Sequence, residues 1–269
     1  MARLRCAVAA IEGRRETAPT RAAAKLPLTH ALDRALGGGL AADGLHEIAP
    51  ASPADGWAAM GFALALAARF MAVRRRAAIV IAEDFALAEM GALYGPGLAA
   101  FGLDLGQLVF VRAPDASALF QAMEDALKSG APAAVIGEAW RLKSYDLAAS
   151  RRLLLAARAG GAPALLIATS AYGAADGFSS AAETRSEIAV APSAHLASAG
   201  GGRGLPGAPA FAVRLVKARI GAGAGQGADP TRTFRLTWKA EELSFDKPTL
   251  SLPVAAAADD RPRAARASG

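Results

Sequence analysis

The sequence predicts an α/β fold with a mostly parallel sheet flanked by helices. Short apolar runs at 77–82 and 164–168 are continuous, as expected for parallel strands buried on both faces. Segments of helical period separate these runs, and this alternation is typical of βαβ units. After residue 168 the pattern changes, and the segments 211–216 and 233–238 predict a C-terminal antiparallel hairpin.

The N-terminal half is expected to begin with a basic, alanine-rich helix or linker at 1–25. A short amphipathic piece starts at 26–28 and ends at the three glycines 37–39, which disfavour a helix. A strand at 45–49, a loop at 50–55 and a long helix at 56–75 follow. The remaining expected elements are strands at 77–82, 108–111, 132–136, 164–168 and 186–190, and helices at 85–93, 116–128 and 147–158.

Three domain-level segments follow from this pattern: an N-terminal helix or linker (1–25), a core domain (26–253) and a disordered tail (254–269). Gly95-Pro96-Gly97 is expected to break the helix that precedes it. The glycine-rich connection 221–227 is expected to be a mobile hairpin loop.

Composition narrows the function classes. The chain has 269 residues and a net charge of +6, which fits an acidic partner such as nucleic acid or an acidic protein face, or solubility alone. Cys6 is the only cysteine and the three histidines are scattered, so neither a disulfide nor a metal site is expected. The apolar stretch 57–73 is interrupted by Gly61 and Arg69, which favours a buried helix over a membrane span. With no secretory signal pattern, we expect a cytoplasmic protein.

The loop between the strand at 45–49 and the helix at 56–75 stands where a phosphate-binding loop would stand. Such a loop needs Gly-x4-Gly-Lys-Ser/Thr, because backbone N–H groups, the lysine and the hydroxyl together hold phosphate and magnesium. Here Ala49 replaces the first glycine, and six residues rather than four separate it from Gly56. Trp57 and Ala58 replace the lysine and the hydroxyl. The sequence therefore predicts a degenerate loop, no bound cofactor and no catalytic residues.

Three acids lie near the expected carboxyl ends of the strands. Glu83 and Asp84 follow the strand at 77–82, and Glu138 follows Gly137 after the strand at 132–136. Ligands of parallel sheets bind at this edge, so these acids are candidate vestiges of a nucleotide site. A capped, solvent-facing helix start explains Glu83 and Asp84 at least as well.

The order of elements resembles the RecA core, most closely over 78–142. More specifically, the chain resembles the ImuA family of RecA-related accessory proteins in bacterial mutagenic repair cassettes. The resemblance covers about residues 26–220 and rests on the segments Leu36–Leu40, Gly44–Ile48, Gly97–Leu103, Gly137–Trp140, Ser150–Leu153 and Thr184–Arg185.

The resemblance implies a non-catalytic accessory or scaffold protein in SOS-induced translesion synthesis. The implied partners are RecA, an ImuB-type polymerase-like hub and, indirectly, an error-prone replicative-type DNA polymerase. In RecA-like proteins the loops after the fourth and fifth core strands face single-stranded DNA. The candidate contacts to DNA or a partner are Arg141, Lys143, Tyr145, Arg151, Arg152, Arg185, Arg219 and Trp238.

Simpler interpretations stand beside several of these candidates. Arg141 and Lys143 fit a solvated face, one of Arg151 and Arg152 is expected to pair with an acid, and Trp238 fits a core aromatic at a strand end. Three other functions stay open: an ATP-dependent enzyme using Arg74–Arg76 or a neighbour's arginine, a single-stranded-DNA binder, and a cell-division inhibitor of the SulA type.

Overall fold

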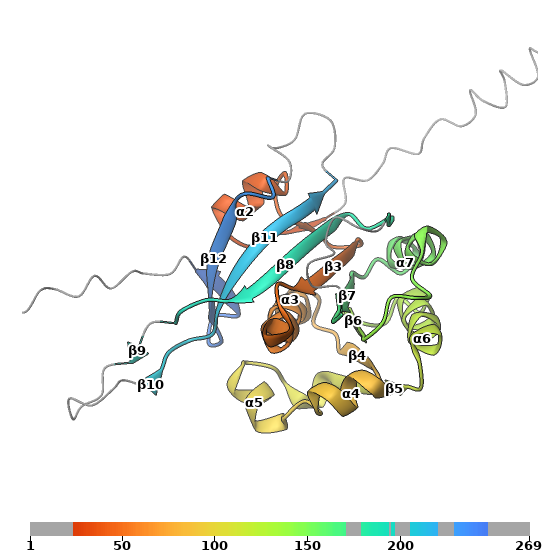
Figure 1. The fold of residues 1–269 in the computed structure, drawn as a ribbon, viewed down its shortest axis with the longest axis horizontal. Helices are drawn as coiled ribbons and strands as arrows, with labels where there is room; N and C mark the ends of the chain where they lie inside the picture. Colours follow the sequence, from red (N-terminus) through yellow and green to blue (C-terminus); the bar gives the residue numbers. More distant parts are fainter. Residues whose placement is uncertain (1–23, 171–178, 194, 197–204, 220–228, 247–269) are drawn as a thin grey trace, which may run out of the picture.

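A sheet of nine strands organises the protein (Figure 1), in the order β13-β12-β11-β8-β3-β7-β6-β4-β5. The computed structural model describes residues 24–170, 179–193, 195–196, 205–219 and 229–246. The expected N-terminal helix up to residue 23, the loop 221–227 and the tail from 254 lie outside these ranges. The strands are β3 (Leu45–Pro50), β4 (Ala78–Glu83), β5 (Leu108–Ala113), β6 (Val135–Ala139), β7 (Ala164–Ala168), β8 (Thr184–Val190), β11 (Ala210–Ala218), β12 (Thr233–Lys239) and β13 (Ser244–Asp246).

The sheet has a parallel part and an antiparallel part. Strands β5, β4, β6, β7, β3 and β8 run parallel to one another. Strands β11, β12 and β13 extend the sheet beyond β8 in antiparallel pairing. The predicted α/β fold with a mostly parallel sheet and a C-terminal antiparallel hairpin is therefore confirmed.

Helices cover both faces of the sheet (Figure 1). One face carries α3, whose Phe62, Leu66 and Phe70 belong to the same apolar cluster as Ile48 and Ile136. The other face carries α6 and α7, which pack against Ile81 and Val135. The helices are α2 (His30–Ala35), α3 (Gly56–Arg74), α4 (Asp84–Met90), α5 (Gly95–Ala100), α6 (Ala116–Lys128) and α7 (Leu147–Gly160), with 3₁₀ turns η1 (Pro53–Asp55) and η2 (Leu105–Gln107).

Helix α3 is apolar on nearly every side because the sheet and the surrounding segments bury it. Among the described residues, one helical stretch, Pro53–Arg74, is long and apolar enough to cross a membrane. Its most apolar window is 67% buried inside the protein. The same length and composition are typical of the core helix of a globular protein.

Aspartate caps fix the starts of the two helices on the opposite face. Asp115 accepts a hydrogen bond from the N–H of Ala118 (2.8 Å) at the start of α6. Asp146 does the same for Ala149 (2.7 Å) at the start of α7. Side-chain acceptors at this position satisfy an otherwise unpaired N–H of the first turn.

The structure contains two short strand pairs and one short strand that the sequence did not predict. Two-residue strands β1 (Lys25–Leu26) and β2 (Leu40–Ala41) pair around α2, and β9 (His195–Leu196) pairs with β10 (Leu205–Pro206). Strand β13 follows the predicted hairpin. A three-residue strand is too short for its apolar period to be recognised in the sequence.

Two predicted boundaries were wrong. The helix expected at 85–93 ends at Met90, because Gly91 has φ 80° and turns the chain. Gly95-Pro96-Gly97 was expected only to break the preceding helix, but it also forms the start of α5. Proline is tolerated in the first turn of a helix because the N–H that it lacks would have no partner there.

The second boundary concerns β6, which was expected at 132–136 and runs from Val135 to Ala139. Gly137 does not end this strand. A Cβ at Gly137 would collide with the sulfur of Met123, so glycine here accommodates α6. Glu138 therefore lies inside the strand rather than in the loop after it.

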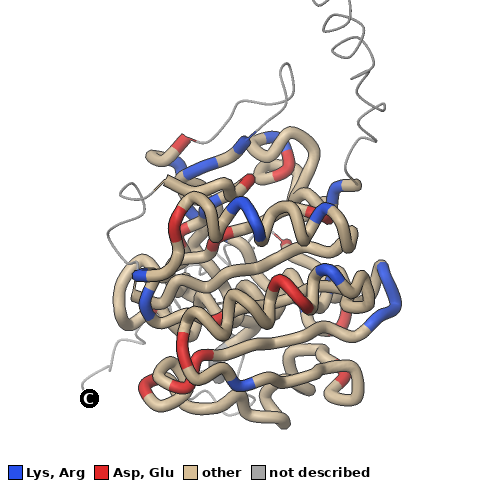
Figure 2. The backbone as a smooth tube through the Cα atoms, turned by 90° about the vertical axis from the view of Figure 1, so that its right-hand side faces the viewer, with Lys and Arg blue, Asp and Glu red and all other residues tan. Residues whose placement is uncertain are grey.

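Charged residues of both signs are interspersed over the visible elements (Figure 2). Although the chain carries a net charge of +6, the described Lys and Arg residues do not gather into a single basic stripe in this view.

Candidate functional site at the carboxyl edge of the sheet

The carboxyl ends of β3, β4, β6 and β7 meet at one edge of the sheet, because these strands are parallel. Residues that follow these strands converge there, and open α/β sheets bind their ligands at such an edge. The candidate site consists of the β3–α3 loop, the ends of β4, β6 and β7, and the loop after β6.

Asp55 closes the β3–α3 loop from inside. Its side chain is buried, and its Oδ1 accepts a hydrogen bond from the N–H of Val190 at the end of β8 (2.8 Å). Its Oδ2 accepts from the hydroxyl of Ser52 (2.6 Å). A further backbone bond joins the N–H of Ala51 to the carbonyl of Ile188 (2.8 Å). The loop is thus bonded to β8, with a carboxylate directly before the first turn of α3.

The replaced phosphate-loop positions have ordinary structural places. Ala49 is buried near the end of β3, where it clusters with Ala168. Gly56 begins α3, and a Cβ there would lie 2.6 Å from the Cε atom of Met90. The indole of Trp57 is half-exposed and Ala58 is partly buried. These side chains offer neither the cation nor the hydroxyl that a phosphate and its magnesium need.

The acids after β4 have different partners. Glu83 is buried, and its Oε2 accepts a hydrogen bond from the backbone N–H of Trp140 (2.8 Å). Asp84 is partly exposed and forms an ion pair with Arg112 (2.9 Å). Glu83 therefore joins the ends of β4 and β6, and Asp84 joins α4 to β5.

Glu138 is buried in β6, in register with Ala82 of β4 and Ile167 of β7. Burial raises its pKa to about 7, because a charged carboxylate is poorly solvated there. Among the described residues, the hydroxyl of Thr169 is buried without a hydrogen-bond partner, and Thr169 follows β7 beside Ala139. A carboxyl that holds its proton near neutral pH is a weak cation ligand. The described residues contain no cluster of three His, Cys, Asp or Glu side chains that could hold a metal.

The loop after β6 carries the exposed part of the site. Arg141 lies over the ring of Phe85 (5.6 Å to the centroid), and Phe85 contacts Trp140 (5.4 Å between centroids). The carbonyl of Trp140 accepts a hydrogen bond from the hydroxyl of Ser170. Arg141 and Lys143 are exposed, as the solvated-face interpretation requires. Phe85 was not among the residues predicted for this site.

Tyr145, one of the expected contacts to DNA or a partner, is instead buried. Its hydroxyl donates to Oε1 of Glu47 (2.5 Å), and burial with the adjacent carboxylate raises its pKa. In this position the ring is inaccessible to a nucleic acid. Helix α7 and its N-terminal loop bring Tyr145 against the sheet, where it contacts Phe120 (5.3 Å between centroids).

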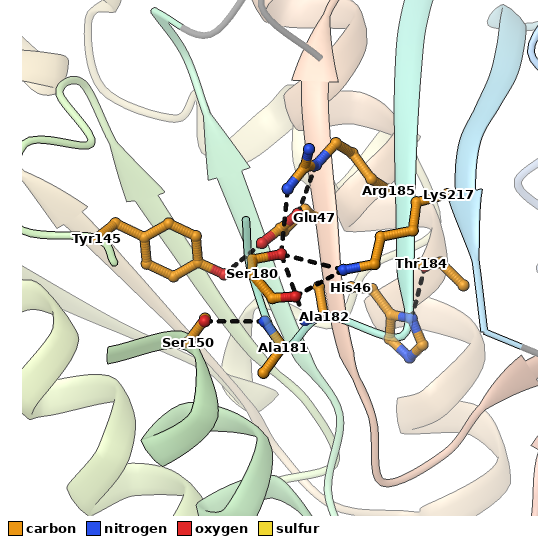
Figure 3. A network of polar contacts seen from close by, with 10 residues as sticks. All are labelled: His46, Glu47, Tyr145, Ser150, Ser180, Ala181, Ala182, Thr184, Arg185 and Lys217. Carbon is orange, nitrogen blue, oxygen red and sulfur yellow. Dashed lines mark hydrogen bonds and ion pairs between the residues drawn. The ribbon is translucent and has the colours of Figure 1, made fainter. Parts of the chain in front are cut away.

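Arg185, another expected contact, is buried in the same polar network (Figure 3). Its Nε donates to Oε2 of Glu47 (2.7 Å) and its Nη2 donates to the hydroxyl of Ser180 (3.1 Å). Lys217 of β11 donates to the carbonyl of Ser180 (2.7 Å). The Glu47–Arg185 pair thus joins β3, β8 and the segment before β8. Removing one partner of such a pair leaves a buried charge unpaired, which is strongly destabilising.

The other candidate contacts do not lie on one surface. Arg151 and Arg152 are exposed on α7, and Arg152 pairs with Glu124 (3.4 Å), as expected for one of the two. Arg219 is exposed after β11, where its N–H donates to the carbonyl of Glu183, at the opposite edge of the sheet. Trp238 is fully buried, stacks on Phe101 and donates to its carbonyl (2.9 Å). The core interpretation of Trp238 is confirmed.

The fold and this edge define a class of protein: an α/β protein with a parallel core sheet whose strand–loop–helix unit at β3–α3 is closed by an internal carboxylate. Comparison with known sequences adds particular relatives. Two curated relatives, both called Protein ImuA and both from Caulobacter vibrioides (strains NA1000 / CB15N and ATCC 19089 / CIP 103742 / CB 15), are each 34% identical over 165 residues.

The matched region is 58% of this chain and 64% of each relative. No protein-family profile matches the chain. The chain is thus similar to these ImuA proteins over part of its length, and the resemblance predicted from the sequence motifs is confirmed.

We predict that Glu138→Gln stabilises the protein above neutral pH. Below pH 4.5 the carboxyl is protonated in both the folded and the unfolded chain. Between pH 4.5 and about 7 the unfolded chain releases this proton while the folded chain retains it, so the free energy of unfolding falls as pH rises. The variant removes this loss and should gain up to about 3 kcal/mol at pH 8.

Chemical denaturation at pH 4.5 and pH 8 measures the effect, with Glu89→Gln, an exposed position on α4, as the matched control. Equal stability changes for the two variants at both pH values would contradict the assignment of Glu138 as a buried, protonated carboxyl.

Proposed function

We propose that this chain is a non-catalytic, RecA-like accessory protein of the mutagenic translesion-synthesis cassette, induced by DNA damage. It would act in the cytoplasm through protein contacts with RecA and with an ImuB-type hub, and through that hub with an error-prone polymerase. The matched region spans less than two thirds of the curated relatives. The partners and the activity are therefore part of this proposal.

The observation that carries the proposal is the hydrogen bonding of Asp55. A phosphate at this loop would meet the buried carboxylate of Asp55 directly before the helix N-terminus, where an anion would otherwise be favoured. The two like charges would repel each other, and no lysine stands in the loop to neutralise either one. The arrangement supports a RecA-like body without ATP hydrolysis.

The sheet supports the same proposal. Strand β3 has parallel neighbours on both sides, the β3–α3 unit follows it directly, and an antiparallel extension continues beyond β8. This arrangement is compatible with the RecA-like core expected from the sequence. Glu83, which could resemble a water-activating acid, instead accepts a backbone hydrogen bond from Trp140. A general base with no held triphosphate has nothing to activate.

The proposal predicts saturable binding of the purified chain to a RecA filament on single-stranded DNA or to an ImuB-type hub. Biolayer interferometry with the immobilised full chain measures both interactions. Serum albumin at the same concentration is the control for unspecific capture by a basic protein. Absence of binding to both partners would contradict the scaffold function.

A second candidate function, direct binding of single-stranded DNA, is favoured by one observation. Phe85, Trp140 and Arg141 form an aromatic and cationic cluster beside the exposed Lys143. Exposed rings can stack on bases, and nearby cations can bind phosphates. The backbone of Trp140 is held on both sides by Glu83 and Ser170, which fixes the cluster in place.

For this second function, Arg141→Glu with Lys143→Glu should weaken binding to an oligo-thymidine. The slope of log K against log salt should fall by about 1 for each phosphate that the variant no longer neutralises. The matched control is Arg232→Glu, since Arg232 lies over the ring of Phe234 at the antiparallel end of the sheet (4.8 Å). Weak binding of oligo-thymidine by the wild type would rule out this function for the cluster. An equal loss of binding in Arg232→Glu would rule it out as well.

A further inference from the structure

Strand β5 ends the sheet, and its outer edge pairs with no other strand of the described residues (Figure 1). On the inner side, all six of its residues pair with β4. A free edge presents a row of N–H and C=O groups that a further strand can bind, and proteins protect such edges with short strands, charges or proline. The strand at the other end, β13, is protected in this way: it has three residues, and its Asp246 forms an ion pair with Lys239 (3.0 Å).

Strand β5 lacks this protection. Its first four residues, Leu108–Val111, are apolar, and its one charged residue, Arg112, forms an ion pair with Asp84 of α4 (2.9 Å). Val109 is 49% exposed on the face of the sheet that carries α6. Phe110 is 44% exposed on the opposite face, because successive side chains of a strand alternate. Apolar side chains are thus half-exposed on both faces of this edge.

The helices beside β5 leave further apolar surface open. Helix α5 buries none of its residues, and α4 buries only Ala86. Half of the large apolar side chains that are exposed in the described part of the chain fall between residues 85 and 110. Outside β5 these are Phe85, Tyr94 and Leu105. Exposed apolar side chains that gather in one region mark an interaction surface, whereas single ones are ordinary.

The charges at this edge favour a second copy of the chain as the occupant. Arg112 is already neutralised by Asp84, so the edge offers a charged partner no counter-charge. An uncharged apolar edge matches another uncharged apolar edge, and every copy of the chain carries one. Contacts between the same surface of two copies are also the commonest way in which proteins form dimers.

A two-fold axis perpendicular to the sheet would pair two β5 strands in antiparallel orientation. With the axis at Phe110, the two Phe110 rings lie opposite each other, and Val109 of one copy lies opposite Val111 of the other. Aromatic and β-branched pairs of this kind stabilise antiparallel strands. The two Arg112 residues then lie four residues apart along the strands, about 14 Å from the rise of a strand. This exceeds the screening length of about 8 Å at physiological ionic strength, so their repulsion is weak.

We propose that the protein forms a symmetric dimer in which the β5 strands of two copies pair and the two sheets become continuous. The contact buries Val109 and Phe110 and gives partners to the backbone groups of the free edge. It does not involve the β3–α3 loop, and it does not depend on the function proposed above.

Sedimentation velocity of the full chain, from micromolar to several hundred micromolar, measures this association. We expect the mass to rise from the 27.2 kDa of the monomer towards twice that value. Val109→Lys and Phe110→Lys place a charge at the centre of the edge and should keep the chain monomeric. Leu155→Lys and Val190→Lys, at exposed apolar positions of α7 and β8, are the matched controls and should dimerise like the wild type. A monomeric wild type, or unchanged dimerisation of both edge variants, would overturn the proposal.

A cross-link tests the pairing without introducing a charge. In a Cys6→Ser background, Phe110→Cys should oxidise to a disulfide-linked dimer. Opposite residues of antiparallel strands lie about 5 Å apart at Cα, within the range of about 4.4–6.8 Å that a disulfide spans. Leu155→Cys, the control, should stay monomeric under the same oxidant. Disulfide-linked dimers from both variants, or from neither, would overturn the proposed contact.

Discussion

The hydrogen bonds of Asp55 are the constraint on which the functional account depends. They join the loop after β3 to the end of β8, so that the start of α3 is fixed relative to the parallel sheet. A glycine-rich loop at this place leaves its N–H groups available to a phosphate, whereas here a buried carboxylate stands directly before the helix. The same interaction that secures the architecture therefore disfavours the ligand that this architecture commonly binds.

A second polar centre lies on the other face of β3. Glu47 accepts hydrogen bonds from both Tyr145 and Arg185, and Lys217 holds the segment before β8 through Ser180. These bonds join the loop before α7 with β3, β8 and β11, which lie on either side of the boundary between parallel and antiparallel strands. A rigid connection between the two parts suits a protein that presents surfaces to partners, because the relative positions of these surfaces are then set by the fold.

The sequence was sufficient for elements whose pattern is local. The continuous apolar runs predicted β4 and β7, and segments of helical period predicted α6 and α7. It failed where a distant residue decides, as at Gly137, which stays within β6 because Met123 packs against it. The site divides in the same way. The absent lysine and hydroxyl are visible in the loop itself, whereas the burial of Tyr145 and Arg185 depends on Glu47, which is 98 and 138 residues away in the chain, respectively.

Calorimetric titration of the full chain with ATP and magnesium tests whether Asp55 closes this loop to nucleotide, with the indole N–H resonance of Trp57 as a local reporter. Trp57 lies half-exposed in the first turn of α3, beside the loop that Asp55 closes. If the loop is closed in this way, we expect no saturable heat and an unchanged indole resonance at millimolar nucleotide. Micromolar binding accompanied by a shift of the Trp57 resonance would contradict it and would make this loop a functional nucleotide site.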